Sequence, residues 1–569
     1  MNAPLSTPPI MPSVTPLVLI AGGGPTGLTL AIELRRAGID VRVIDKASHQ
    51  ALHSQALVVQ ARTLEQLQRY GLAERAVAEG RPLKHGKIFS EGKQIASLDL
   101  EEIPSRYPFA LFLPQTKTEE ILREHLRTLG VAVEQETELV GFSEDAELVC
   151  QLLHADGVME TIRPRWLVGC DGSHSRVREL AGIEFEGASV DLHFFLGDLE
   201  LEGTDNPTDS IAVHLHEGNV VFLGRLTDQL TRVIVALHSE QDNHAKDRDG
   251  EGGDGAQRKL TINDFEGPMR EAGLDLRVKG ADWMTPFHVN DRQANLYRKG
   301  GVFLAGDASH IHSPVGGQGM NTGMQDAANL AWKLAAVSRG AEDRLLDSYQ
   351  EERAKVGEAL LRFTERGLKL ATASNTFVEA VRDFFMGRLT KASPVQEAIL
   401  GFVSETAITY RESSIVYDYG GDGALHAGDR MPDIVVSEID ANAGRARAST
   451  LLRDWKQASH LAIFLNAEDD AVAQAAAELP SVPVVGLRSS DLDDEGQALL
   501  GHDAKVFLLR PDGYIGFRGA VSQRDEWLLY VRQMGIRSPF FDPDAAVPGF
   551  LEENVPEETV PARTVAGEW

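Results

Sequence analysis

Within residues 17–45, short apolar runs alternate with a stretch of helical periodicity. LVLIA at 17–21 is an apolar run typical of a buried strand, and GGGPTG follows it directly. LTLAIELRRAG at 28–38 has apolar residues at helical spacing, and VRVID at 41–45 predicts the next strand. This β-α-β order predicts a parallel sheet with a nucleotide at its first turn.

The pattern becomes β-rich in the middle of the chain. TEEILREHLRTL at 118–129 predicts an amphipathic helix, and WLVGCDGSHSRVREL at 166–180 predicts a strand, a turn and a helix. From about 185 to 237, short β-prone runs are separated by Gly, Asn and Asp, as in an antiparallel sheet. The polar, glycine-rich stretch at 239–259 predicts a surface loop.

The last part of the chain predicts helices followed by a small α/β unit. GVFLAGD at 301–307 predicts a buried strand. Helical patterning, with breaks, continues after it through 347–370 and 379–400. YDYGGDGALHAGD at 417–429 is rich in Gly and Asp and indicates a linker. Strand-like runs such as KVFLLRPDGYIGFRG and a helix near 525–534 follow it.

Composition narrows the classes of function. At 569 residues, the chain exceeds what one hydrophobic core usually supports, so we expect two or three domains. Its net charge of -29 argues against nucleic acid as a partner, and Cys150 and Cys170 are too few for a disulfide scaffold or a four-cysteine zinc site. Residues 1–16 lack the features of a signal peptide, and no apolar run approaches the roughly 20 residues of a membrane span. We therefore expect a cytoplasmic protein without a membrane partner.

Two glycine-rich segments carry the candidate chemistry. Gly22, Gly24 and Gly27 can make a tight turn and admit a pyrophosphate, and Asp45 is placed to accept hydrogen bonds from a ribose. In the second segment, Asp307 ends a strand and a glycine loop leads to a helix expected to run to about Val337. That helix start would present the N–H groups of residues 320–321 to an anion. A ligand with a ribityl chain and a ring that becomes anionic on reduction fits Asp307 and this helix start, which indicates flavin.

The second segment also carries a family resemblance. GDASHIHSPVGGQGMNTGMQDAANLAWKL at 306–334 resembles the GD motif of the FAD-dependent aromatic hydroxylases, the group A flavoprotein monooxygenases. CDGSHSRVR at 170–178 resembles the DG motif of that family, and SYQEER at 348–353 is similar to its SYxxER segment. With the first glycine motif, the resemblance covers about residues 17–355.

The resemblance implies an α/β fold in which a Rossmann-like FAD-binding domain carries an inserted β-sheet substrate domain, as in p-hydroxybenzoate hydroxylase. The C-terminal region resembles the thioredoxin-like domain of phenol hydroxylases, but no cysteine follows Cys170, so we expect it to serve packing or homodimerisation. The expected division is a disordered lead-in at 1–16, the FAD-binding domain with a helical extension at 17–184 and 288–400, the substrate domain at 185–287, a linker at 401–425, the thioredoxin-like domain at 426–540 and a tail at 541–569.

The resemblance also assigns cofactor-binding residues. By similarity, the pyrophosphate lies at the first glycine turn, the ribityl chain at Asp307 and the flavin pyrimidine edge at the start of the following helix. The Pro314 carbonyl is implied to lie near the reactive flavin face and the substrate, and Asp171 belongs to the motif that serves both FAD and NAD(P)H. The full set of implied cofactor residues is Gly22, Gly24, Pro25, Thr26, Gly27, Asp45, Gln115, Asp171, Asp307, Pro314, Gly319, Met320 and Asn321.

Several positions leave alternatives open. Relatives often carry arginine at the Gln55 position. We therefore expect FAD binding to be somewhat weaker here unless Arg62 or Lys46 supplies the cation, with Gln55 a weaker contact. Arg232 lies where some relatives place an arginine that binds substrate or moves the flavin, although a solvent-facing charge is equally consistent. His214 and His216 share one side of a predicted strand and either line the pocket or face solvent.

The resemblance implies a reaction. NADH or NADPH would reduce bound FAD, O2 would form a C4a-hydroperoxide, and one oxygen atom would pass to a phenolic or polycyclic aromatic substrate. The alternatives are another FAD oxidoreductase of the same fold, such as an oxidase or halogenase, and a flavin-binding redox sensor. His310 and His312 lack further ligands at metal spacing, so we expect a packing role or a hydrogen bond at the flavin face and no metal.

Overall fold

The computed structural model describes most of the chain, and several sequence predictions lie outside the described part. These are the lead-in at 1–16, the polar loop at 239–259, the tail at 541–569, Gln55 and Pro314. The described residues are 17–49, 56–190, 192–238, 260–287, 289–313, 316–371, 393–440, 445–450 and 460–536.

A six-stranded sheet forms the first layer, in the order β20-β21-β12-β1-β2-β8. All neighbouring strands run parallel except β20 and β21. Residues of β1, β12 and β21 are fully buried, because helices cover both faces of a parallel sheet and its strands are therefore continuously apolar. The strands are β1 Val18–Ala21, β2 Val41–Ile44, β8 Val133–Glu134, β12 Trp166–Gly169, β20 Arg298–Lys299 and β21 Val302–Leu304.

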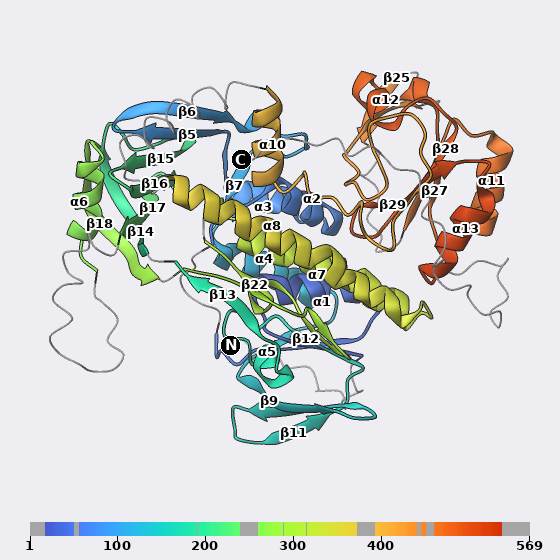
Figure 1. The fold of residues 1–569 in the computed structure, drawn as a ribbon, viewed down its shortest axis with the longest axis horizontal. Helices are drawn as coiled ribbons and strands as arrows, with labels where there is room; N and C mark the ends of the chain where they lie inside the picture. Colours follow the sequence, from blue (N-terminus) through green and yellow to red (C-terminus); the bar gives the residue numbers. More distant parts are fainter. Residues whose placement is uncertain are drawn as a thin grey trace, which may run out of the picture.

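Long helices pack around this sheet and cross the middle of the molecule, as Figure 1 shows for α7 and α8. The helix predicted at 118–129 begins slightly earlier, at Gln115. The helices are α1 Pro25–Arg36, α2 Ala61–Tyr70, α3 Ala73–Glu79, α4 Gln115–Thr128, α5 Arg176–Ala181, α7 Gly319–Ser338, α8 Asp347–Ala371 and α10 Ser393–Val403.

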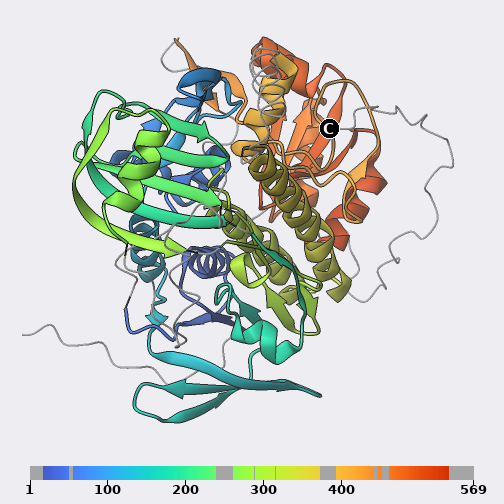
Figure 2. The same cartoon turned by 60° about the vertical axis from the view of Figure 1, so that its left-hand side comes forward.

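A seven-stranded sheet forms the second layer, in the order β18-β14-β17-β16-β15-β5-β6, and α6 (Asn263–Glu271) covers its outer face (Figure 2). The predicted β-rich region supplies β14 Leu192–Gly203, β15 Ser210–His216, β16 Asn219–Arg225, β17 Leu230–His238 and β18 Leu276–Phe287. The other two strands, β5 His85–Ser90 and β6 Lys93–Asp99, come from before the expected domain. Their addition corrects the sequence-based picture of a sheet built from residues 185–287 alone, because the parallel β5–β15 pairing joins distant segments and leaves no local pattern.

Residues 185–189 depart from the prediction in another way. This strand, β13, pairs with β19 (Asn290–Ala294), and β19 pairs with β22 (His310–Ile311) in a separate small sheet. Two further three-stranded sheets flank the core. They contain β3 Val58–Val59, β7 Ala110–Phe112 and β4 Arg81–Leu83, and β9 Thr137–Glu144, β10 Leu148–His154 and β11 Met159–Ile162.

The C-terminal part forms a five-stranded sheet in the order β23-β29-β28-β26-β27. It does not stand apart from the rest of the chain, because Phe464 and Trp527 join the same buried cluster as Leu345. β23 lies inside the predicted linker at 401–425 and pairs with β29. The elements are β23 Tyr417–Asp418, β24 Val435–Asp440, β25 Arg445–Thr450, β26 Leu461–Leu465, α11 Asp469–Glu478, β27 Val484–Leu487, α12 Asp494–Leu500, β28 Lys505–Leu509, β29 Ile515–Ala520 and α13 Arg524–Gln533.

Fully buried charges join this C-terminal sheet to α7 and α8. Glu352 on α8 accepts hydrogen bonds from Lys333 Nζ at 2.8 Å and from Arg510 Nη1 at 2.7 Å, and all three side chains are inaccessible to solvent. Burial disfavours the charged carboxylate, but Arg510 and Lys333 outweigh burial and hold the pKa of Glu352 well below its ordinary 4.5. The docking of the C-terminal region therefore depends on this ionised carboxylate.

Among the helices that the structure describes, none combines the length and apolar character needed to cross a membrane.

Replacing Glu352 tests this docking. Glu352→Gln removes the carboxylate bound by buried Lys333 and leaves buried Arg510 with Asp512 alone, so we expect the free energy of unfolding to fall by about 3–5 kcal/mol in chemical denaturation. The exposed pair Lys355–Glu412 supplies the control, because Glu412→Gln should change that free energy by less than about 1 kcal/mol. The Glu352 contribution should be complete above pH 4.5 and be lost as the pH falls below it. Equal effects of the two substitutions at neutral pH would contradict the account.

Candidate active site

A cavity of about 590 Å³ lies between the two main layers, at the carboxyl ends of β1, β12 and β21. This is where open α/β sheets bind their ligands. One side of the cavity, called here the dinucleotide side, is formed by the first glycine turn, the start of α4 and the loops that follow β12 and β21. Its lining residues are Gly24, Pro25, Thr26, Gln115, Cys170, Gly172, Asp307, Gly316, Gly317, Gln318, Gly319 and Met320. The opposite side is one face of the seven-stranded sheet.

The glycines of the first turn serve two purposes. Gly22 has a φ of 107°, and a Cβ on it would lie 2.2 Å from the carbonyl oxygen of Cys170. A Cβ on Gly27 would lie 2.0 Å from the carbonyl oxygen of Gly22. A Cβ on Gly24 would meet no atom within 4 Å. Packing therefore requires two of the glycines, whereas the third leaves open space beside the start of α1.

Asp45 and Arg123 hold this turn from two sides. Asp45 Oδ2 accepts a hydrogen bond from the Gly23 amide at 2.7 Å, and Arg123 Nη2 donates one to the Gly23 carbonyl at 2.5 Å. Arg123 lies on α4, and our sequence interpretation missed it because a charged residue on an amphipathic helix has no distinguishing pattern. It places a guanidinium next to the glycine turn.

Of the two cations considered for the pyrophosphate, Arg62 lies elsewhere. Arg62 is buried and donates hydrogen bonds to the Asp512 carbonyl at 2.6 Å and to Glu65 at 2.9 Å, so it belongs to the contact with the C-terminal region. Lys46 is exposed. Arg62 therefore does not replace the missing pyrophosphate cation, because the distant Asp512 carbonyl binds its guanidinium.

Asp307 points its carboxylate at the cavity. It lines the cavity and makes no hydrogen bond within the described residues. Enclosure by protein raises the pKa of its carboxyl group, because the charged form loses hydration there. Hydroxyl groups of a ligand would supply the missing hydrogen-bond donors.

The start of α7 offers hydrogen-bond donors, whereas Asp307 offers an acceptor. Its N-cap residue Gln318 makes no side-chain cap, and the first turn contains no acidic residue. Gly316 and Gly317 have positive φ values of 86° and 62°, which bring the loop back to the helix without bulky side chains. Helix geometry leaves the N–H groups of residues 319–321 without intrahelical acceptors, so this end favours an anionic group.

The side chain of Asn321 bonds to protein groups around the glycine loop. Its Nδ2 donates to the carbonyls of Val58 and Gly317 at 2.8 and 2.9 Å, and its Oδ1 accepts from the Gln60 amide at 2.9 Å. These bonds fasten the glycine loop to the strand at 58–59. The side chain therefore fixes the loop, and only the backbone N–H remains for a ligand.

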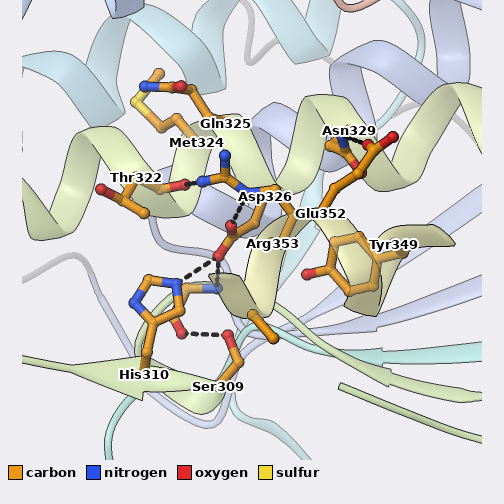
Figure 3. Close-up of polar contacts among 12 residues, drawn as sticks. Ser309, His310, Thr322, Met324, Gln325, Asp326, Asn329, Tyr349, Glu352 and Arg353 are labelled. Carbon is orange, nitrogen blue, oxygen red and sulfur yellow. Dashed lines mark hydrogen bonds and ion pairs between the residues drawn. The ribbon is translucent and has the colours of Figure 1, made fainter. Parts of the chain in front are cut away.

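Asp326 joins the strand end, the loop and α8 (Figure 3). Its Oδ2 accepts hydrogen bonds from the Gly306 amide at 3.0 Å and His310 Nε2 at 2.8 Å, and its Oδ1 accepts one from Arg353 Nε at 2.5 Å. Burial disfavours ionisation, yet Arg353 and His310 hold the pKa of Asp326 below its usual value. The SYQEER segment thus acts through Arg353 as an anchor.

The two histidines of this segment have different surroundings. His310 packs against Asp326, whereas His312 lines the cavity and donates from Nδ1 to the Ser313 carbonyl at 2.8 Å. Burial lowers the pKa of His312 to about 4, so its ring is neutral at physiological pH. No group of three or more metal-ligating side chains occurs among the residues described.

The remaining dinucleotide-side residues are Gln115 and Asp171. Gln115 lines the cavity, and its amide donates to Glu119 at 2.9 Å. Asp171 turns its carboxylate to α5, where it accepts hydrogen bonds from the Ser175 hydroxyl and the amides of Arg176 and Val177. Asp171 therefore holds the start of a helix, and its neighbours Cys170 and Gly172 line the cavity.

The opposite wall of the cavity is almost entirely apolar. The cavity-facing side chains in its central strands are Phe194, Leu196, Ile211, Val213, Val220, Phe222, Ile234 and Ala236. Arg232 interrupts them and forms two hydrogen bonds with Asp198, at 2.5 and 2.9 Å. Only 2% of Arg232 is exposed, so the alternative of a solvent-facing charge is wrong.

His214 and His216 face away from this wall. His214 stacks on Phe89 with ring centroids 4.5 Å apart, and His216 contacts Glu91 at 2.7 Å. Along β15 they alternate with the cavity-lining residues Ile211 and Val213, so they occupy the other face of the sheet. The hypothesis that they line the pocket is therefore wrong.

These features fit a flavin dinucleotide. The open space at Gly24 suits a pyrophosphate, and the uncapped start of α7 suits an anionic ring edge. Asp307, which has no hydrogen-bond partner among the described residues, suits a polyol chain. A family model described as an FAD binding domain matches residues 16–364. The chain belongs to the FAD-dependent aromatic hydroxylase family.

Several proteins similar to this flavoprotein monooxygenase carry informative names. A 6-methylpretetramide 4-monooxygenase from Streptomyces rimosus is 35% identical over 89% of this chain and 91% of its own length. A pentachlorophenol 4-monooxygenase from Sphingobium chlorophenolicum is 33% identical over 91% of this chain and 97% of its own. The solved structure of an anhydrotetracycline hydroxylase from Streptomyces rimosus superposes with a TM-score of 0.74 at 30% identity, covering 92% of this chain and 99% of that one. The p-hydroxybenzoate hydroxylase-like fold expected for the FAD-binding part is thereby confirmed.

Removing the Asp307 carboxylate tests the cofactor side of this hydroxylase. Asp307→Ala should weaken FAD binding roughly tenfold or more, because hydrogen bonds to a charged group each contribute about 1.5–3 kcal/mol. FAD titration of the apoprotein measures the dissociation constant. Glu147→Ala, at an exposed carboxylate on the β9–β10 hairpin, is the matched control and should bind FAD like the wild type. Wild-type affinity and turnover in Asp307→Ala would remove the assignment.

Proposed function

We propose that this enzyme is an NAD(P)H-dependent monooxygenase that uses bound FAD and O2 to hydroxylate a phenolic or polycyclic aromatic substrate. The observation that carries the proposal is the shared cavity, which has an anion-favouring, dinucleotide-compatible side and an apolar sheet opposite it. The names of the relatives, which include a chlorophenol monooxygenase and tetracycline-pathway monooxygenases, support an aromatic substrate.

The chain's own residues have separable tasks in this reaction. Bound FAD, reduced by NAD(P)H, would supply the activation of O2. Asp307 and the turn at residues 22–27 would hold the dinucleotide, and the backbone N–H groups of residues 319–321 would stabilise negative charge on the reduced ring. Pro314, which lies outside the described residues, remains our proposed contact at the reactive face. NADH and NADPH are both compatible with the single glycine motif.

The sheet wall would bind the substrate and exclude water. Eight apolar side chains from four strands face the cavity, so a flat aromatic ring can bury its surface there. By excluding water, this wall would also limit the unproductive release of peroxide. Arg232 would provide the polar contact on this wall, with Asp198 fixing its guanidinium.

The C-terminal region is proposed to have a thioredoxin-like fold. β26 and β27 run parallel with α11 between them, β28 and β29 form an antiparallel pair, and α13 follows. We propose that it serves packing and dimerisation instead of electron transfer, because its sequence contains no cysteine.

Oxidation of NADH and NADPH by the FAD-loaded enzyme tests the function. A panel of simple phenols and polycyclic phenols should include at least one compound that stimulates oxidation and yields a product heavier by one oxygen atom, detected by mass spectrometry. Stimulation that forms only hydrogen peroxide with every compound would favour an oxidase. Absence of stimulation by any aromatic compound would contradict the hydroxylase assignment and favour the redox-sensor alternative.

A pair of substitutions tests the proposed contact of Arg232. Arg232→Met and Asp198→Asn break the same buried ion pair, so both should lower the free energy of unfolding by about 3–5 kcal/mol. Only Arg232 lines the cavity, so Arg232→Met should raise KM for the aromatic substrate roughly tenfold above that of Asp198→Asn, the loss of about one charged hydrogen bond. Equal KM values in the two variants would assign Arg232 a structural role alone.

A further inference from the structure

Besides Asp326, the carboxyl group of Glu405 lies against the first turns of α7. Glu405 accepts a hydrogen bond from Thr322 Oγ1 at 2.9 Å and a shorter one from the side-chain amide of Gln325. Only 2% of Glu405 is exposed, and its φ of 61° lies in the left-handed region that few non-glycine residues adopt. It is thus fixed beside α7 at the cost of an unusual backbone conformation.

The neighbouring chain keeps Glu405 in this place. α10 ends at Val403, and Glu405 lies in the turn that follows it. The Phe402 carbonyl accepts a hydrogen bond from Gln318 Nε2 at 2.8 Å. The Ser404 carbonyl accepts one from the Arg62 amide at 3.2 Å. The segment is therefore fastened both to the residue that precedes α7 and to α2, so the carboxyl group has little freedom to move away from the helix.

The sequence of α7 otherwise keeps negative charge away from its N-terminus. Its first turn has no acidic residue, and Asp326, seven residues after Gly319, is paired with Arg353. Burial raises the pKa of Glu405 to about 8 and Asp326 adds to the rise, while Thr322, Arg353 and Gln325 oppose it. Near neutral pH, the carboxyl group against this end of the helix is therefore largely uncharged.

We propose that Glu405 is a positioning residue that sets the reduction equilibrium of the flavin through α7. The inference rests on the proposed function, because it requires the flavin ring at the start of this helix. While Glu405 is protonated, the positive end of α7 is fully available to the negative charge that the ring gains on reduction. When Glu405 loses its proton to solvent, its negative charge opposes the negative charge that the ring gains on reduction.

Glu405 contacts α7 close to the helix start at which the flavin ring is proposed to lie. Thr322 and Gln325 lie three and six residues after Gly319, or roughly 4.5 and 9 Å along the axis at the usual rise of about 1.5 Å per residue. Both side chains are buried, so mobile ions screen the interaction weakly. Asp326 from α7 and Arg353 from α8 are the charged groups with the largest influence on Glu405. Charged side chains of α8 and of the segment after Glu405 line the same cavity as Glu405, namely Glu351, Glu352, Lys355, Arg411 and Glu412.

The midpoint potential of the bound flavin, measured from about pH 6 to about pH 9, tests the proposal. Wild type and Glu405→Gln should agree at the acidic end. Above about pH 8, the wild-type potential should fall below that of the variant by about 30 mV, which corresponds to a tenfold change in a two-electron equilibrium. Glu412→Gln removes an exposed carboxylate from the same stretch of chain and should follow the wild type.

A second variant keeps the test valid if Glu405→Gln does not fold. Thr322→Val removes a hydrogen bond that favours the ionised carboxylate, so the pH at which the potential changes slope should move upward. Identical pH profiles for wild type and Glu405→Gln, or an unmoved profile in Thr322→Val, would overturn the proposal, because a purely structural role leaves the potential unchanged. Failure of all the proteins to bind FAD would instead refute the proposed function.

Discussion

The fold of the cofactor side depends on one buried carboxylate, Asp326. It binds the end of the β21 strand through Gly306, the β22 strand through His310 and the α8 helix through Arg353. A buried carboxylate is costly unless each oxygen is paired, and here both oxygens have partners. Because the loop from Asp307 to Gly319 lies between these attachments, fixing its two ends also fixes the direction of the Asp307 carboxylate and the start of α7.

This constraint explains how a loop that is poor in side chains can present a defined surface. Gly316 and Gly317 take backbone conformations that other residues avoid, and Asn321 fastens the loop to residues 58–60. The ligand would then meet backbone N–H groups held by surrounding contacts. Preorganised dipoles of this kind stabilise developing charge without reorganising during the reaction. The opposite sheet contributes apolar surface, so polar and apolar tasks are divided between the two layers.

Local sequence was sufficient where the physical requirement is local. Gly22 and Gly27 are needed because a Cβ would collide with backbone, and the strand, turn and helix around them follow from short-range periodicity. Asp307 and the start of α7 were predicted for the same reason. The family resemblance supplied the assignment of the β-rich segment to the substrate side, which periodicity alone could not provide.

The missed features all depend on contacts between distant segments. Strands β5 and β6 join the large sheet through pairing with β15, and Arg62 is occupied by Asp512, which lies 450 residues away. Arg123 and Glu405 have no motif around them, and their importance appears only when α4 reaches the glycine turn and α10 reaches α7. Neither hydrophobic periodicity nor residue type indicates which distant segments will come into contact.

The proposed reaction of this cavity is the transfer of one oxygen atom from O2 to an aromatic ring. The most direct measurement is a single turnover of the reduced, substrate-bound enzyme with isotopically heavy dioxygen, followed by mass spectrometry of the product. The account predicts that one heavy oxygen atom appears in the aromatic product and that heavy water leaves the product unlabelled. A product that takes its oxygen from water, or a turnover that releases only peroxide with every aromatic compound that binds, would contradict it.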